Sequence, residues 1–220
     1  MYQLEYIEIN RGQQPDALVI WLHGLGADGY DFKSLIEQLP LPDALAIKFV
    51  LPHAPVLPVT LNNSAPMNAW YDIYSLQENS PEDEAGINLA MHSVENLIST
   101  QFSHYQAQRI IIAGFSQGGA VALHCYLHGS VEIAGVLALS TYLPLKDTLA
   151  DLQATRLASK DIFMAHGEAD EILPLSYATR SRDALMAQGV HVDWHQYPMA
   201  HNLCNQEIDD LSVWLSNKLS

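Results

Sequence analysis

An apolar run that ends in Gly114-Phe115-Ser116-Gln117-Gly118 limits most strongly how this chain can fold. The run, 109–113, has the length of a buried strand, and the small residues at 119–123 suit the start of a helix. G-x-S-x-G between a strand and a helix predicts a sharp, strained turn that lifts one serine hydroxyl above a sheet. Glycine is needed beside that serine because a Cβ there would collide with a neighbouring element. The alternative is an ordinary Gly-Ser turn.

Strand-like and helix-like segments alternate along the rest of the chain. Residues 2–10 alternate apolar and polar, as a half-exposed edge strand does. We expect further strands at 17–23, 46–51, 109–113, 135–139, 162–166 and 190–197, and helices at 84–99, 118–128, 177–188 and about 208–219. This alternation predicts an α/β fold, with a mostly parallel central sheet and helices on both faces.

Composition limits the class of protein further. The 220 residues suit one domain, 1–220, and a chain that is 49% hydrophobic and 16% charged is not disordered. The net charge of −15 disfavours nucleic acid and anionic lipid surfaces as partners. A homodimer is compatible with this composition.

The chain also carries few signs of export or membrane insertion. Its apolar runs are shorter than the roughly 18 residues that a membrane span needs, and its start lacks the pattern of a secretory signal. The two cysteines, Cys125 and Cys204, lie far apart and indicate reduced thiols. We therefore expect a cytoplasmic protein.

The segment 52–81 interrupts the alternation. It contains five prolines and little periodicity, yet many of its side chains are apolar, among them Leu57, Trp70 and Leu76. A long irregular segment within a compact domain usually serves a function. We expect it to line or cover an apolar binding site, with these three residues contacting the substrate. The alternative is a loop held by its own small core.

A serine hydroxyl needs a base, usually a histidine that a carboxylate orients. In a parallel sheet such groups gather at the carboxyl ends of the strands. Asp170 follows the strand 162–166 at that end, and Glu168 in the same loop is the fallback. Asp161 begins a strand, and Asp193 lies inside one, so neither suits the role.

His201 is the expected base among the ten histidines, because it follows the last strand and precedes the final helix. The order Ser116…Asp170…His201 is that of the α/β-hydrolases. His191 and His195 resemble a metal-binding pair, but four residues of strand span roughly 13 Å, too far for one zinc ion. We therefore expect no metal.

An acyl-transfer site also needs donors for the developing oxyanion. One is the backbone N–H of Gln117, which follows the serine. The other is expected at Leu25, because Gly24 and Gly26 allow the backbone after the strand 17–23 to turn an amide inward. The alternative for these glycines is a plain strand–helix turn. The sequence lacks the full pattern of a phosphate-binding loop at this place.

The assembled motifs resemble the phospholipase/carboxylesterase family, whose best-known members are the acyl-protein thioesterases. In chain order they are L-H-G-L-G at 22–26, P-H-A-P at 52–55, W-Y-D-I at 70–73, G-F-S-Q-G-G at 114–119, L-S-T-Y-L-P at 139–144, H-G-E-A-D at 166–170 and the segment 199–204. Two departures stand out: Thr141 and Ala200 each replace a glycine that is usual in the family.

The resemblance implies an α/β-hydrolase fold and the same triad of Ser116, Asp170 and His201, with oxyanion donors at Leu25 and Gln117. It implies hydrolysis of carboxylic esters or thioesters through an acyl-enzyme, on substrates such as lipidated proteins or lysophospholipids, without any cofactor. It also implies that the segment after P-H-A-P helps to form an acyl tunnel. The departure at Ala200 leaves the acyl-length preference open.

Two further readings remain. The fold could serve as a non-catalytic lipid-binding or interaction module, against which the complete set of catalytic candidates argues. Among enzymes, a general short-chain carboxylesterase competes with an acyl-protein thioesterase or lysophospholipase. The sequence does not separate these two enzymes.

Overall fold

The structure is a computed structural model that describes residues 2–77, 80–101 and 103–220. Its main sheet has seven strands in the order β1-β3-β2-β6-β7-β8-β9. The strands are β1 (Tyr6–Arg11), β2 (Ala17–Leu22), β3 (Ile47–Pro52), β6 (Ile110–Phe115), β7 (Gly135–Leu139), β8 (Asp161–Gly167) and β9 (His191–Tyr197). Only β1 runs antiparallel to its neighbour within this sheet, so the prediction of a mostly parallel sheet is confirmed.

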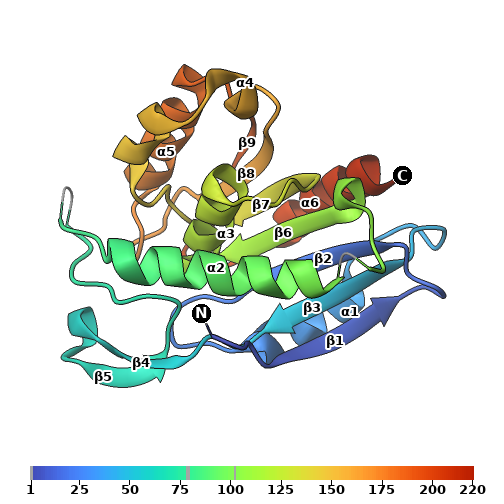
Figure 1. Cartoon of the computed structure of the whole chain (residues 1–220), viewed down its shortest axis with the longest axis horizontal. Helices are drawn as coiled ribbons and strands as arrows, with labels where there is room; N and C mark the ends of the chain where they lie inside the picture. Colours follow the sequence, from blue (N-terminus) through green and yellow to red (C-terminus); the bar gives the residue numbers. More distant parts are fainter. Residues whose placement is uncertain (1, 78–79, 102) are drawn as a thin grey trace.

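Helices cover both faces of this sheet (Figure 1). One core cluster joins one sheet face to α2 (Glu84–Gln101), α3 (Gln117–His128) and α5 (Leu175–Ala187). A second cluster joins the opposite face to α1 (Lys33–Gln38) and α6 (Asn205–Leu219). Strands β2, β6 and β7 are buried along their whole length except at Phe115, because both of their faces are covered.

The edge strands differ from these central ones. β1 alternates between exposed and half-buried residues, as its sequence pattern predicts, and pairs with β3 in an antiparallel ladder from Tyr6 to Arg11. β9 forms the other edge and is largely half-exposed. The alternating apolar and polar side chains of an edge strand reflect one covered and one open face.

Some short elements escaped the sequence analysis. These are α1, α4 (Ala154–Leu157) and the 3₁₀ turns, each six residues or fewer, which is too short to show a helical period. Within 52–81, which the sequence indicates as irregular, the chain forms an antiparallel hairpin of β4 (Val56–Val59) and β5 (Ala65–Asn68). Prolines at 58 and 66 hide these strands from a pattern search, because proline cannot donate to a ladder.

The β4–β5 hairpin lies apart from the main sheet, at the left of Figure 1, beyond the end where β6 points. No helix among residues 2–77, 80–101 and 103–220 is long and apolar enough to cross a membrane. The carboxyl ends of β2, β6, β8 and β9 lead directly into the loops that hold the candidate functional residues.

Candidate active site

Ser116 stands at the turn between β6 and α3 with the backbone angles φ 54° and ψ −121°. A non-glycine residue with this positive φ is strained and persists only where its surroundings enforce it. The close packing of strand and helix does so here: a Cβ on Gly118 would collide with the carbonyl oxygens of Leu22 and His23 in the neighbouring strand end. The sequence pattern thus produces the sharp, strained serine turn that it predicts.

Ser116, His201 and Asp170 form a continuous hydrogen-bonded chain. The Nε2 atom of His201 lies 2.9 Å from the Oγ of Ser116, and its Nδ1 lies 2.6 Å from the Oδ2 of Asp170. The carboxylate thus holds the imidazole in the tautomer that leaves Nε2 able to accept the serine proton.

Asp170 is buried, and its second oxygen is held by the backbone. Its Oδ1 accepts the N–H groups of Ile172 at 3.0 Å and Leu173 at 2.8 Å. Its side chain is fully inaccessible, whereas 16% of the His201 side chain is exposed. The carboxylate is therefore fixed while the imidazole still meets the substrate.

The loops that bear Asp170 and His201 are tied together beyond the ends of β8 and β9. The N–H of Glu168 donates to the carbonyl of Tyr197 at 2.8 Å, and the N–H of Ala169 donates to Met199 at 3.0 Å. These bonds continue the β8–β9 ladder for two more steps. They set the distance between the carboxylate and the base.

His166 supports the same loop from within the sheet. It is fully buried, and its Nε2 donates to the carbonyl of Leu173 at 2.8 Å while lying 3.4 Å from the Oδ2 of Asp170. Burial lowers the pKa of His166, with the Leu173 carbonyl and the Asp170 charge opposing that shift. A neutral His166 leaves the Asp170 charge available to His201.

The two residues expected to supply the oxyanion donors line the same cavity as the serine. Leu25, Ser116 and Gln117 all line it, and Gln117 is the first residue of α3, where backbone N–H groups lack partners within the helix. The positive end of the helix dipole lies there too, which favours a developing negative charge.

The side chain of Gln117 ties this region to the 52–81 segment. Its Oε1 accepts the N–H of Trp70 at 3.0 Å, and its Nε2 donates to the carbonyl of Tyr71 at 2.8 Å. The indole N–H of Trp70 donates in turn to the carbonyl of His23 at 2.8 Å. Trp70 therefore connects the β2 loop, which bears Leu25, with the α3 terminus.

His23 completes this network. Its Nε2 accepts the N–H of Ala54 at 3.0 Å, so the proton resides on Nδ1, which donates to the carbonyl of Gly24 at 2.8 Å. Burial lowers the pKa of His23, although the Gly24 carbonyl opposes the shift. A neutral, fully buried imidazole thus fixes the turn before Leu25.

The cavity around Ser116 has a volume of about 520 Å³ and a mostly apolar wall. Leu76 lines it, as the sequence analysis expects, but Leu57 and Trp70 do not. Trp70 is only 1% exposed and packs in the core beneath the site, and Leu57 lies in the β4–β5 hairpin. Apolar residues that line it in their place include Phe32, Leu61, Ile73, Phe115, Ile172 and Leu173.

The other candidates lie away from the serine. Glu168 is exposed, with only its backbone tied to β9. His191 and His195 lie in β9, where each contacts an aspartate, Asp161 and Asp193 respectively. Among the described residues there is no group of three or more histidine, cysteine or acidic side chains arranged to hold a metal ion.

Thr141 is a contributor that the sequence analysis did not foresee. Its hydroxyl donates to the carbonyl oxygen of Ser116 at 2.7 Å, and a Cβ on Gly119 would press against its side chain. The signal in the sequence was only that Thr141 replaces a usual glycine. The structure shows that the extra hydroxyl contacts the backbone of the serine turn.

A mostly parallel sheet with a strained serine turn and a Ser-His-Asp chain defines the class: a serine hydrolase of the α/β-hydrolase fold. The sequence model of the phospholipase/carboxylesterase family matches residues 4–219. The chain belongs to this family.

Known relatives and solved structures are similar to this protein over nearly the whole chain. Acyl-protein thioesterase 1 of Neurospora crassa is 39% identical over 213 residues, which cover 92% of this chain and 87% of that protein. Acyl-protein thioesterase 1 of Mycosarcoma maydis is 36% identical over 220 residues, covering 93% and 92%. The crystal structure of Zea mays acyl-protein thioesterase 2 is 30% identical, with a TM-score of 0.88 over 98% of this chain and 99% of that one.

Proposed function

We propose that this enzyme removes acyl groups from ester and thioester carriers, including acylated proteins, with Ser116 as nucleophile, His201 as base and Asp170 as the group that orients it. The observation that carries the proposal is the pair of contacts on one imidazole, 2.9 Å to Ser116 and 2.6 Å to Asp170. The names of the relatives, acyl-protein thioesterases, favour acyl thioesters on proteins as substrates.

In the proposed reaction His201 takes the proton of Ser116 while the Oγ attacks the acyl carbonyl. The oxyanion forms toward the N–H groups of Leu25 and Gln117, which supports its charge. His201 then gives the proton to the leaving oxygen or sulfur, and the acyl-enzyme forms. Water, deprotonated by the same imidazole, releases the acid and restores the serine.

Labelling with a fluorophosphonate tests the nucleophile. The wild-type protein should be labelled and should hydrolyse p-nitrophenyl butyrate, whereas Ser116→Ala should do neither. A Ser130→Ala variant is a matched control, because Ser130 contacts Glu95 far from the site. Equal labelling of wild type and Ser116→Ala would remove Ser116 from the proposal.

The carrier is tested with matched substrates. An S-acylated peptide and its O-acyl serine analogue, each with octanoyl and palmitoyl chains, separate thioester from ester preference and short from long acyl groups. We expect both carriers to be cleaved, because the serine mechanism needs only a leaving group that His201 can protonate. Cleavage of p-nitrophenyl esters without release of either acyl peptide would restrict the enzyme to a general carboxylesterase.

We also propose that the enzyme works in the reducing environment of the cytoplasm. Cys125 and Cys204 are both free, and Cys125 is buried, where burial raises the pKa of its thiol and keeps it unreactive. Imaging of the tagged protein in its host cell tests the location. Accumulation in an oxidising compartment would refute it.

A further inference from the structure

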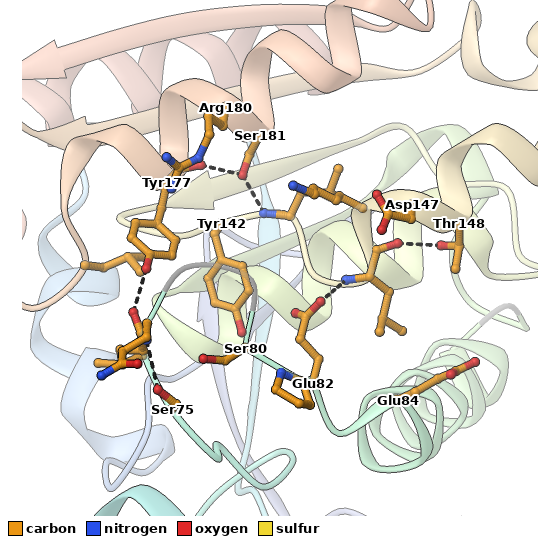
Figure 2. Close-up of a pocket in the computed structure, with 17 residues that line it drawn as sticks. Ser75, Ser80, Glu82, Glu84, Tyr142, Asp147, Thr148, Tyr177, Arg180 and Ser181 are labelled. Carbon is orange, nitrogen blue, oxygen red and sulfur yellow. Dashed lines mark hydrogen bonds between the residues drawn. The ribbon is translucent and has the colours of Figure 1, made fainter.

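A second cavity of about 550 Å³ adjoins the catalytic one. The two cavities share Leu76, Tyr142 and Leu173, which form a common wall. Figure 2 shows Tyr142 standing at the centre of this second cavity, with Tyr177 and Ser181 from α5 on one side and Ser80 and Glu82 on the other. The two cavities are therefore direct neighbours on either side of these three residues.

The shared wall is braced from α5. The hydroxyl of Tyr177 donates to the carbonyl of Leu76 at 2.6 Å, and the hydroxyl of Tyr142 lies 2.9 Å from that of Tyr71 (Figure 2 shows the first bond). Leu173 is 5% exposed and buried beneath them. These contacts hold the common wall in place.

The side chains around Ser116 belong to two opposite faces of the sheet. The positions of these side chains indicate on which side of the serine the leaving group of a substrate lies. His201 packs on Phe115 with 4.9 Å between ring centroids, and Phe115 packs on Phe32 at 5.9 Å; both phenyl rings belong to the side with α1 and α6. Because His201 must protonate the leaving group, the carrier lies on this side of the serine.

The acyl group must then extend in the other direction. Ile73 and Tyr142, on the opposite wall of the catalytic cavity, pack against the core on the side of α2, α3 and α5. The second cavity opens beyond Tyr142 on that same side, between α5 and residues 75–77 and 80–84. It therefore continues the path of the acyl chain away from the carbonyl.

The walls of the two cavities differ in chemistry. The catalytic cavity is mostly apolar, whereas most side chains of the second carry hydroxyl, amide or charged groups, such as Ser80, Glu82, Thr148 and Ser181. Glu82 accepts the N–H of Leu145 at 2.9 Å through Oε2 and, as a carboxylate, has capacity for further donors.

We propose that this second cavity takes the distal end of an acyl chain that carries a hydroxyl group, and that Glu82 accepts a hydrogen bond from that hydroxyl. The inference rests on the proposed function, since it needs an acyl group on Ser116. The hydroxyls of Thr148 and Ser181 already donate to the carbonyls of Leu145 and Tyr177, so the group open to a ligand is the second carboxylate oxygen of Glu82. An unsubstituted chain that reaches this oxygen displaces its water and returns no hydrogen bond. A terminal hydroxyl replaces the lost water contact, so hydroxylated long acyl groups are the favoured substrates.

Paired p-nitrophenyl esters test this preference. Each pair, from eight to sixteen carbons, has an unsubstituted acyl chain and one with a hydroxyl on its last carbon. Glu82 is an exposed carboxylate. For chains long enough to extend past Leu76 and Tyr142, the hydroxylated ester should therefore exceed its unsubstituted partner in kcat/KM by about threefold to tenfold, the effect expected of one such hydrogen bond. Equal rates at every length, or faster hydrolysis of the unsubstituted esters, would overturn the proposal.

Two variants locate the preference. Glu82→Leu should bring the ratio of the paired esters close to one, and Glu82→Ala, which removes the acceptor without adding bulk, serves if the first variant does not fold. Glu37→Leu, an acidic-to-leucine change on the exposed face of α1, is the matched control and should keep the wild-type ratio. A preference that survives in both Glu82 variants would remove Glu82 from the site.

Hydrolysis of p-nitrophenyl butyrate is measured beside each pair, because this short chain does not need the second cavity. Failure of butyrate hydrolysis in the wild type would contradict the proposed function itself. Normal butyrate hydrolysis with no hydroxyl preference would contradict only the further inference.

Discussion

Asp170 joins two parts of the site through one carboxylate. One oxygen contacts His201, and the other accepts two backbone N–H groups of its own loop. The contacts with the loop need only an acceptor, whereas orientation of the imidazole needs an acceptor that also stabilises its positive charge.

Asp170→Asn separates these roles. The amide oxygen still accepts the N–H groups of Ile172 and Leu173, so we expect little change in the melting temperature. We expect kcat to fall by about 10⁴-fold, as when a triad carboxylate is replaced by an amide that favours the wrong imidazole tautomer. Ester hydrolysis and thermal unfolding are the measurements, and a fall of less than tenfold would contradict the assigned role.

Thr141 holds the serine turn through its hydroxyl, which donates to the Ser116 carbonyl. Thr141→Val keeps the side-chain shape and removes the bond, which is worth about 1 kcal/mol. We expect kcat to fall about fivefold with KM unchanged, because the strained serine is less well fixed. Thr141→Ser should restore kcat. A lower melting temperature with unchanged kcat would show that the bond serves stability alone.

Trp70 links the two oxyanion loops, since its indole N–H donates to the carbonyl of His23. Trp70→Phe leaves that buried carbonyl without its donor, which costs about 1–3 kcal/mol. We expect a lower melting temperature and a lower kcat. Trp21→Phe is the matched control, because the buried indole nitrogen of Trp21 has no hydrogen-bond partner in the described part of the chain. Equal kcat in both variants would mean that Trp70 supports the core only.

At the scale of elements, the junction of β2, β6 and α3 depends on close backbone contact. A methyl group on Gly118 would meet the carbonyl oxygens of Leu22 and His23, which are backbone atoms and have little freedom to move. Gly118→Ala should destabilise the fold by about 1–3 kcal/mol, the usual cost of overpacking, and should impair activity more than stability. Urea unfolding and ester hydrolysis measure the two effects, and wild-type behaviour in both would contradict this reading of the junction.

The strands were predictable from the sequence because their apolar runs are short and separated by clear turns. Strands β6, β7 and β8 lie within one or two residues of the expected ranges. The chain direction of a parallel sheet then brings Ser116, Asp170 and His201 to one edge, as the structure shows. Position after a strand end was therefore enough to select them among many acidic and histidine residues.

The walls of the cavity were less predictable. Leu57, Trp70 and Leu76 share an apolar character and a common segment, yet only Leu76 faces the cavity. Apolarity in the sequence does not show which side of an irregular segment a residue faces, because no period relates neighbouring side chains. The same limit hid the position of Tyr142, which lines both cavities.

At the scale of the whole molecule, buried titratable groups determine how stability depends on pH. Burial lowers the pKa of His23 and His166, and it lowers that of His124 to about 4. Each is neutral when folded and takes up a proton more readily when unfolded. The contribution of these histidines to the stability of the fold is fully present above about pH 6.5, the ordinary pKa of imidazole. It is lost as the pH falls below that value.

Glu207 acts in the opposite direction. It is fully buried in the first turn of α6, and burial raises its pKa to about 8, although the backbone N–H of Cys204 opposes the shift. The folded state keeps its proton where the unfolded state has released it, so stability falls as the pH rises from about 4.5 to about 8. With the histidines acting below pH 6.5, the melting temperature should be highest near that pH.

Glu207→Gln tests the alkaline side of this maximum. The amide stays neutral in both states, so the variant should resemble the wild type at pH 5 and be more stable at pH 8. Each pKa unit corresponds to about 1.4 kcal/mol of stability. At pH 8 we therefore expect the melting temperature of Glu207→Gln to exceed that of the wild type by at least about 4 °C. The repulsion that comes with the net charge of −15 also grows with pH, but it is nearly common to both proteins and cancels in their difference. Parallel melting curves from pH 5 to 9 would show that Glu207 is ionised in the folded enzyme.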